Sequence, residues 1–302
     1  MKLFIPAVFL IAFATSFSTR ADDFYISCLT DNTIAKISGD TASIFSSGTA
    51  PFWGLAVDRL GNLYVSNQGV NGILKYASVN GTLSTTPTVF ASGLHAPLGL
   101  AFDQSGNLYE SESCGNINKF IFSGRTLSDQ PVLFVDGSSE HANLVGSRQP
   151  DDLAFDQQGN LYVAIEIGGI LKFTNSPSGL SNMPDEKPFS TVSRARQMAF
   201  DKKGNLFTAN HLVGENYVYE YSNTPSGLSS TPKIFAKGNG LDGPYGVTID
   251  SVGNLYVTNW GFYQGTDILE YPVINGILSN IPVVYATGFG SPVLMVAIKS
   301  QP

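Results

Sequence analysis

The residues best suited to chemistry are a mixed set of carboxylates, an arginine, a histidine and aromatic rings. They are Trp53, Glu112, Asp151, Asp152, Arg196, His211, Tyr245 and Trp260. Carboxylates and arginine supply hydrogen-bond acceptors and donors, and aromatic rings supply flat apolar surfaces. Such a mixture is typical of a pocket that binds a small molecule or a peptide. If these side chains meet in space, they predict a binding site for a small ligand or a protein partner.

The motifs of common catalytic sites are missing from the sequence. There is no G-x-S-x-G nucleophile elbow, no H-E-x-x-H zinc motif and no phosphate-binding loop. Two cysteines and three histidines do not form a zinc pattern. The sequence therefore identifies no catalytic residue and predicts neither a metal site nor a cofactor. A divalent cation such as Ca²⁺ or Zn²⁺ is the alternative.

The elements that must position these residues come from a fourteen-residue phrase that occurs five times. The phrase contains the core D-x-x-G-N-L, whose aspartates are separated by 45, 53, 45 and 49 residues. This is the period at which one repeat forms one four-stranded blade of a propeller. The five aspartates are Asp58, Asp103, Asp156, Asp201 and Asp250.

Each phrase is predicted to form two strands joined by a turn. In the first copy, residues 54–57 are a short apolar strand. Asp58 begins the turn, and its carboxylate is expected to accept hydrogen bonds from backbone N–H groups. Gly61 supplies a positive φ, and residues 63–65 begin the next strand. A second motif, L-S-x-x-P, recurs five times between the third and fourth strands and predicts an outer hairpin.

The two ends of the chain are expected to complete a sixth blade. Residues 24–27, 34–37 and 43–45 resemble strands two to four of a repeat, and residues 292–298 resemble the innermost strand. Pairing of the two ends would remove the open sheet edge. We therefore predict an all-β, six-bladed β-propeller with four-stranded blades, whose first blade is closed by the C-terminal strand. Residues 22–302 are expected to be a single domain.

In a propeller, the loops before each inner strand and after each second strand open on one face, which predicts that the eight residues lie there. The same face would receive the long connection of residues 136–151, with Glu140, His141 and Arg148, and an aromatic loop at residues 261–264. Structural interpretations stay open. Asp151 and Arg196 would be an ion pair between blades, His211 a surface histidine, and Trp53 and Tyr245 plugs of the channel mouth.

The phrase G-L-A-x-D-x-x-G-N-L-Y-V resembles the NHL-repeat propellers and the family of gluconolactonase and senescence marker protein. The resemblance covers about residues 24–298. In the lactonase-like members it implies a divalent metal in the central channel, held by Glu, Asn and Asp ligands. The corresponding positions here are Trp53, Leu98, Asp151, Arg196, Tyr245 and Val293. Only Asp151 is a ligand type, so the sequence departs from the family's metal set.

Three functional hypotheses follow. The first is an exported propeller that binds a small ligand or a protein on its loop-rich face. The second is a divergent metal-dependent lactonase or esterase that uses Asp151 or Asp152 with Glu112 and Asn210. The third is a cell-envelope module whose L-S-x-x-P hairpins make the contacts. Streptogramin lyases share the propeller phrases, but their histidine and glutamate pair has no motif match here.

Targeting, charge and cysteines set further expectations. Residues 1–21 resemble a secretory signal peptide, because Lys2 precedes a long apolar stretch. This predicts a secreted or periplasmic monomer with no membrane span in the mature chain. A net charge of −7 opposes nucleic-acid binding. Cys28 and Cys114 are expected in blades one and three, as separate thiols, with a disulfide as the alternative.

Overall fold

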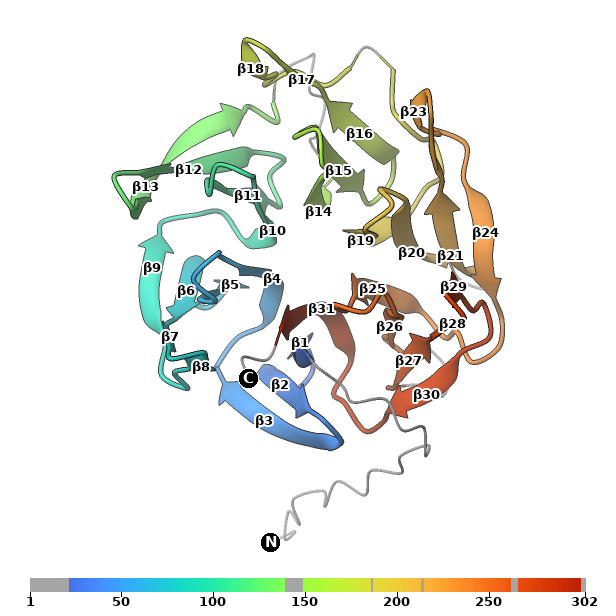
Figure 1. Ribbon diagram of the computed structural model, residues 1–302. Helices are drawn as coiled ribbons and strands as arrows, with labels where there is room; N and C mark the ends of the chain where they lie inside the picture. Colours follow the sequence, from blue (N-terminus) through green and yellow to red (C-terminus); the bar gives the residue numbers. More distant parts are fainter. Residues whose placement is uncertain (1–21, 139–148, 186, 213–214, 262–265, 300–302) are drawn as a thin grey trace, which may run out of the picture.

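The computed structural model describes residues 22–138, 149–185, 187–212, 215–261 and 266–299. Six antiparallel sheets are arranged in a ring, and one strand of each lies next to the common axis (Figure 1). The predicted six-bladed propeller is thereby confirmed. The part of the chain that the structure describes contains no helix of the length and apolar character needed to cross a bilayer.

From the inside outward, the first three blades consist of the following strands. Blade one contains β31 (Pro292–Lys299), β1 (Asp22–Cys28), β2 (Thr33–Ser38) and β3 (Thr41–Ser47). Blade two contains β4 (Phe52–Val57), β5 (Leu63–Asn67), β6 (Gly72–Tyr76) and β9 (Thr88–Ser92). Blade three contains β10 (Pro97–Phe102), β11 (Leu108–Glu112), β12 (Ile117–Ser123) and β13 (Thr126–Val135).

The other three blades follow the same order. Blade four contains β14 (Pro150–Phe155), β15 (Leu161–Ile165) and β16 (Gly169–Phe173). Blade five contains β19 (Ala195–Phe200), β20 (Leu206–Leu212), β21 (Glu215–Tyr221) and β24 (Lys233–Lys237). Blade six contains β25 (Pro244–Ile249), β26 (Leu255–Asn259), β27 (Ile268–Tyr271) and β30 (Val283–Ala286).

Four two-stranded hairpins lie outside these sheets, at the L-S-x-x-P motifs. They are β7 (Ser78–Val79) with β8 (Thr82–Leu83), β17 (Asn175–Ser176) with β18 (Gly179–Leu180), β22 (Asn223–Thr224) with β23 (Gly227–Leu228), and β28 (Val273–Ile274) with β29 (Ile277–Leu278). After β8, Ser84 Oγ accepts a hydrogen bond from Thr86 N at 3.2 Å and donates to Thr86 O at 3.0 Å. The motif serine therefore closes a local turn beside the predicted outer hairpin.

The ring is closed by pairing between the two ends of the chain. β1 and β31 are antiparallel neighbours, with Phe24 opposite Ala297 and Ile26 opposite Met295. Figure 1 shows β31 as the innermost strand of the sheet that β1, β2 and β3 continue. The C-terminal strand therefore supplies the strand that the first repeat lacks, as predicted.

Blade four differs from the others at its outer edge. Its main sheet has three strands, and the place of the fourth is taken by a single bridge between Ile170 and Ser190. The segment before this bridge contains Pro184 and Pro188. Pro184 belongs to the L-S-x-x-P motif, which blades two, three, five and six carry together with a regular outer strand, whereas Pro188 is additional. A proline has no N–H group to donate to a strand ladder, so Pro188 interrupts the outer strand.

The core lies between neighbouring blades. Tyr64 of blade two packs edge-on against Phe90 of its own outer strand and against Phe102 of blade three, with ring centroids 5.1 and 5.3 Å apart. Tyr109 makes the same contacts with Phe134 and Phe155 one blade further on. The repeated aromatic residue of the phrase thus joins each blade to the next.

The D-x-x-G-N turns behave as predicted. Asp103 Oδ1 accepts hydrogen bonds from the backbone N–H groups of Ser105 and Asn107, at 2.8 and 2.9 Å, and Oδ2 accepts from Asn107 Nδ2 at 2.7 Å. Asn107 Oδ1 then accepts Phe122 N at 2.8 Å. One carboxylate therefore fixes the turn, and its asparagine connects the turn to the third strand.

Replacing Asp103 with alanine is expected to lower the free energy of unfolding by about 1–3 kcal/mol, because three hydrogen bonds are lost at once. Denaturant unfolding checks this value. Asp129→Ala is the matched control, because Asp129 is exposed on β13 and, among the described residues, its carboxylate accepts a single long hydrogen bond, from Gln130 Nε2. Equal losses from both substitutions would show that the turn carboxylate is not what stabilises the blade.

Candidate functional site

A bulge in the inner strands presents the site residues to the axis. In all six blades the pairing between the inner strand and the next strand shifts register near the start of the inner strand. Trp53, Asp151 and Tyr245 are each the second residue of their strand and lie within this shift. A β-bulge bends the strand and re-aims a side chain. The residues that vary between repeats therefore sit where the backbone departs from regular pairing.

Arg196 is the centre of the charged part of the site. Its Nη1 pairs with Asp151 Oδ2 from the neighbouring blade, and its Nη2 lies 3.1 Å from Glu166 Oε1. The guanidinium carbon is 4.9 Å from the centre of the Tyr245 ring. The predicted ion pair between Asp151 and Arg196 is therefore present, and it forms part of a larger arrangement with a second carboxylate and an aromatic ring.

Aromatic side chains continue this arrangement around Tyr245. The Tyr245 ring centroid is 6.4 Å from Trp53, 6.1 Å from Trp260 and 6.2 Å from His211. His211 and Trp260 are themselves 5.5 Å apart and meet edge-on. We call this set the Arg196 cluster: Trp53, Asp151, Glu166, Arg196, His211, Tyr245 and Trp260.

The cluster combines buried and accessible side chains. Arg196, His211 and Tyr245 are buried, while Trp53, Glu166 and Trp260 keep part of their surface accessible. Burial lowers the pKa of His211 to about 4, and the Arg196 charge acts in the same direction. His211 is therefore neutral at pH 7. Burial raises the pKa of Asp151 to about 6, although Arg196 opposes the shift.

Two of the predicted site residues have their contacts elsewhere. Glu112 accepts hydrogen bonds from His95 N at 2.8 Å and from Asn116 Nδ2 at 3.0 Å, both in blade three. Asp152 is buried, and its Oδ2 accepts Met198 N at 2.8 Å. Glu112 thus stabilises the loop before β10, and Asp152 connects the inner strands β14 and β19.

Glu166 belongs to the cluster although it is not among the eight predicted residues. A signal was present in the repeat alignment. Glu166, His211 and Trp260 occupy the same position in three successive repeats, at the end of the second strand. The six other members of the cluster are predicted site residues, which the structure brings together around Tyr245.

The channel metal that the lactonase resemblance implies does not fit these residues. The Arg196 guanidinium already pairs with both Asp151 and Glu166, so a dication would have to displace a resident cation. Trp53, Tyr245 and the equivalent positions Leu98 and Val293 carry no carboxylate or amide. Hard dications need several oxygen ligands. In the alternative set of Asp151 or Asp152 with Glu112 and Asn210, Glu112 has its contacts in blade three, and Asn210 Nδ2 donates to Ser193 O at 2.8 Å.

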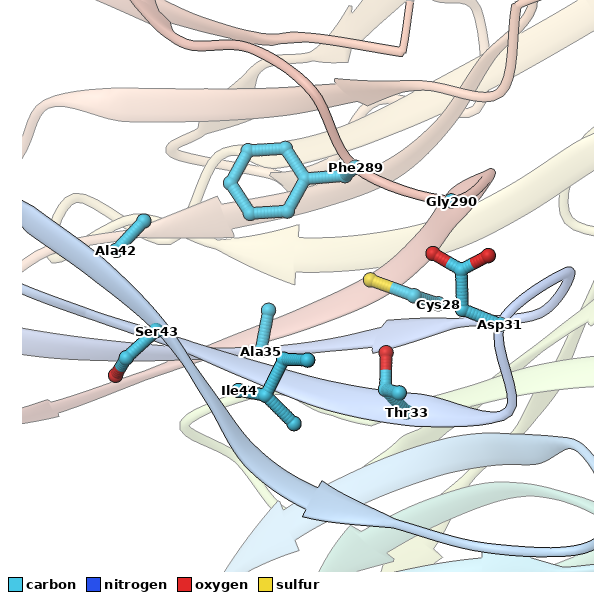
Figure 2. A pocket seen from close by; sticks show the side chains of 9 residues that line it. All are labelled: Cys28, Asp31, Thr33, Ala35, Ala42, Ser43, Ile44, Phe289 and Gly290. Carbon is cyan, nitrogen blue, oxygen red and sulfur yellow. The ribbon is translucent and has the colours of Figure 1, made fainter. Parts of the chain in front are cut away.

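The two cysteines are separate thiols, as the sequence predicts. Cys28 is buried and lines a cavity of about 30 Å³ between blade one and the segment before β31. Figure 2 shows its sulfur directed into this space beside Phe289. The cavity has room for about one or two water molecules, so it is too small for a ligand. Cys114 is exposed on blade three.

A thiol reagent is expected to modify one cysteine in the folded protein and two after unfolding. Burial raises the pKa of Cys28 to about 12, so this thiol is both inaccessible and protonated at pH 8. Cys114→Ala should reduce the native count to zero and the unfolded count to one. Mass spectrometry of the modified protein checks both counts, and modification of Cys28 before unfolding would contradict the structure.

Several residues of the predicted loop face lie outside the described part of the structure. They are Glu140, His141 and Arg148 of the long connection, and Phe262, Tyr263 and Gln264 of the aromatic loop.

Comparison with sequence families gives a short match. Residues 137–173 match the model of the strictosidine synthase-like N-terminal family. A search of curated proteins found no match.

Comparison with solved structures supports the propeller fold along almost the whole chain. A chain of the nidogen/laminin complex has a TM-score of 0.66 at 17% identity, covering 93% of this chain and 100% of that chain. A gluconolactonase from Xanthomonas campestris has a TM-score of 0.62 at 13% identity, with coverage of 93% and 91%. A streptogramin B lyase has a TM-score of 0.60 at 15% identity, with coverage of 95% and 90%. The chain has the fold of the gluconolactonase-like and NHL-type propellers.

Proposed function

We propose that the protein is an exported propeller that binds a small neutral sugar at the Arg196 cluster, without chemistry of its own. The observation that carries this proposal is a pair of N–H groups in the cluster. Trp53 Nε1 and Arg196 Nε are buried and have no hydrogen-bond acceptor among the described residues. Buried donors are nearly always satisfied. A ligand oxygen that enters between the rings would supply the missing acceptor.

The surrounding surfaces favour a ligand with hydroxyl groups and an apolar face. Trp53, Tyr245 and Trp260 provide ring surfaces, and the carboxylates of Asp151 and Glu166 provide acceptors for hydroxyl donors. A groove of about 270 Å³ lies beside Trp260 and is open to solvent. Its lining residues are Leu29, Thr30, Trp260, Gly261 and Ser291. A sugar ring matches both surfaces.

The charge of the cluster favours a neutral ligand over an acid. Two carboxylates, Asp151 and Glu166, face one guanidinium, and His211 is neutral because its pKa is lowered to about 4. At neutral pH these three charged side chains carry a net charge of −1, and Arg194, whose charge also lowers the pKa of His211, lies near them. An anionic ligand that reaches the two carboxylates would meet like charges in a partly desolvated site, where repulsion is strong.

The two tryptophans provide a direct test. The chain contains only Trp53 and Trp260, and both belong to the cluster. We expect saturable changes in tryptophan emission during titration with at least one member of a panel of neutral hexoses and their oligosaccharides. The aldonic acid of the same sugar should bind about tenfold more weakly or not at all, a difference of about 1.4 kcal/mol.

Variants locate the response. Glu166→Gln and Trp260→Phe are expected to weaken binding about tenfold or more. Glu220→Gln is the matched control, because Glu220 pairs with Lys233 at 3.0 Å on the outer strands of blade five. If no neutral sugar changes the emission, or if Glu220→Gln weakens binding as much as Glu166→Gln, the proposal fails.

The lactonase class is the second candidate, and the structural similarity to a gluconolactonase favours it. The same purified sample can be tested for hydrolysis of sugar lactones with and without added Ca²⁺, Zn²⁺ or Mn²⁺. Metal-dependent turnover that is lost in Asp151→Ala would support that candidate and overturn a purely binding role. A response to a protein and to no sugar would instead indicate a protein partner.

Export is proposed from the first 21 residues. We expect the full chain to appear outside the cytoplasm in a host with a general secretory pathway, with its new N-terminus near Asp22. N-terminal sequencing after cell fractionation checks this. A cytoplasmic product that retains Met1 would contradict it.

A further inference from the structure

A second group of chemically competent side chains lies on blade three, apart from the Arg196 cluster. His95 precedes β10, Glu112 ends β11, and Cys114 lies in the turn that follows. One ligand atom from each of these three side chains lies within 4.8 Å of the others. Among the described residues, this is the one such group of histidine, cysteine and carboxylate side chains.

Local hydrogen bonds hold the three side chains around the carboxylate. Glu112 is 3% exposed, and its Oε1 accepts His95 N at 2.8 Å while His95 Nδ1 lies 3.6 Å away. Its Oε2 accepts Cys114 Sγ at 3.2 Å and Asn116 Nδ2 at 3.0 Å. A backbone hydrogen bond from Ser113 N to Ala96 O, 3.2 Å long, also holds this turn. Glu112 is therefore fixed, and the more accessible His95 and Cys114 flank it.

The position of Glu112 is unusual among the repeats. In three of the other five blades the equivalent residue is asparagine: Asn67, Asn210 and Asn259 each donate the side-chain amide to a backbone carbonyl of the preceding loop. In blades one and four the equivalents are Cys28 and Ile165. A carboxylate cannot make that bond. It accepts a backbone N–H instead and brings a negative charge next to a thiol and an imidazole.

We propose that His95, Glu112 and Cys114 bind a borderline divalent cation such as Zn²⁺. Nitrogen, oxygen and sulfur in one group favour Zn²⁺ or Co²⁺ over Ca²⁺ or Mg²⁺, which prefer oxygen ligands alone. The Cys114 thiol loses its proton to solvent when the metal–sulfur bond forms. One thiolate and one carboxylate then balance the charge of the dication, and water completes the tetrahedron.

The site is independent of the proposed sugar binding. It uses none of the residues of the Arg196 cluster, and it differs from the channel metal that the lactonase resemblance implies. It assigns a role to Cys114, which the binding hypothesis leaves unused.

Cobalt provides the sharpest test, because thiolate ligation gives Co²⁺ an intense ligand-to-metal absorption band. We expect one equivalent of Co²⁺ to produce this band and Zn²⁺ to displace it. Zn²⁺ should also slow modification of Cys114 by a thiol reagent about tenfold or more, and binding should release a proton.

The variants separate ligation from structure. Cys114→Ala should abolish the thiolate band, and His95→Ala, which alters a ring that is 75% exposed, should weaken binding about tenfold or more. Glu112→Gln should weaken it similarly. Cys28→Ala and Glu220→Gln are the matched controls and should bind as the wild type does. Absence of the band at micromolar protein, or a band that persists in Cys114→Ala, would overturn the proposal.

Discussion

Replacing Arg196 with methionine is expected to lower the free energy of unfolding by about 3–5 kcal/mol, the usual cost of removing one partner from a buried ion pair. Methionine retains much of the side-chain volume but none of the charge. Asp151 and Glu166 would then lose their common partner, and the Tyr245 ring would lose the stacked guanidinium. Denaturant unfolding at neutral pH measures the loss.

Two further variants show whether charge is the cause. Arg59→Met removes an exposed arginine after β4 and should change the free energy of unfolding by no more than about 0.5 kcal/mol. The double variant Arg196→Met/Asp151→Asn should recover part of the stability, because the uncompensated carboxylate is removed. A double variant that is as unstable as the sum of both single variants would show that packing, and not charge, is responsible.

Replacing Glu110 and Asn118 with valine and leucine is expected to stabilise the protein by about 2–4 kcal/mol at pH 8. Glu110 is fully buried on β11, opposite Asn118 on β12. Asn118 Nδ2 donates to Glu110 Oε2 at 2.9 Å, while Oε1 has no partner among the described residues. The equivalent strand pairs are Val65 with Leu74, Val163 with Leu171, and Val257 with Leu269.

The gain should depend on pH. Burial raises the pKa of Glu110 from its usual value near 4.5 to about 8, and the charge of Glu112 adds to the shift. Between these values the folded protein keeps a proton that the unfolded chain releases. Wild-type stability therefore falls as pH rises through this window. The Glu110→Val/Asn118→Leu variant should lose this contribution.

Unfolding curves at pH 5 and pH 8 measure the effect. The difference in stability between the double variant and the wild type should be larger at pH 8. Part of the wild-type pH dependence should persist in the variant, because burial also raises the pKa of Asp152 to about 8. Glu110→Val alone is the control, since it leaves Asn118 without its acceptor. A difference that is the same at both pH values would show that Glu110 is ionised in the fold.

The fold was predictable because the residues that form the turn and the contact with the next blade occur within each repeat. Asp103 and Asn107 form the turn from within five residues, and Tyr109 packs against the next blade at each recurrence. The number of repeats then determines the number of blades. The matching segments at 24–27 and 292–298 predicted how the ring closes, which the pairing of β1 with β31 confirms.

The site was predictable only in part, because its geometry depends on departures from the repeat. No pattern in the amino-acid sequence indicates the register shifts at Trp53, Asp151 and Tyr245. Glu166 directly follows the second strand of its repeat, but its pairing with Arg196 depends on the distance between neighbouring blades. The outer strand of blade four was expected to be regular, and the additional proline Pro188 interrupts it.

The central claim is that the Arg196 cluster holds a neutral sugar, and diffraction from crystals soaked with the tightest-binding sugar of the panel tests it most directly. We predict density for one sugar ring against Trp260, within hydrogen-bond distance of Glu166 and of the Trp53 or Arg196 N–H group that now lacks an acceptor. Density at any other surface, with the cluster unchanged, would contradict the account.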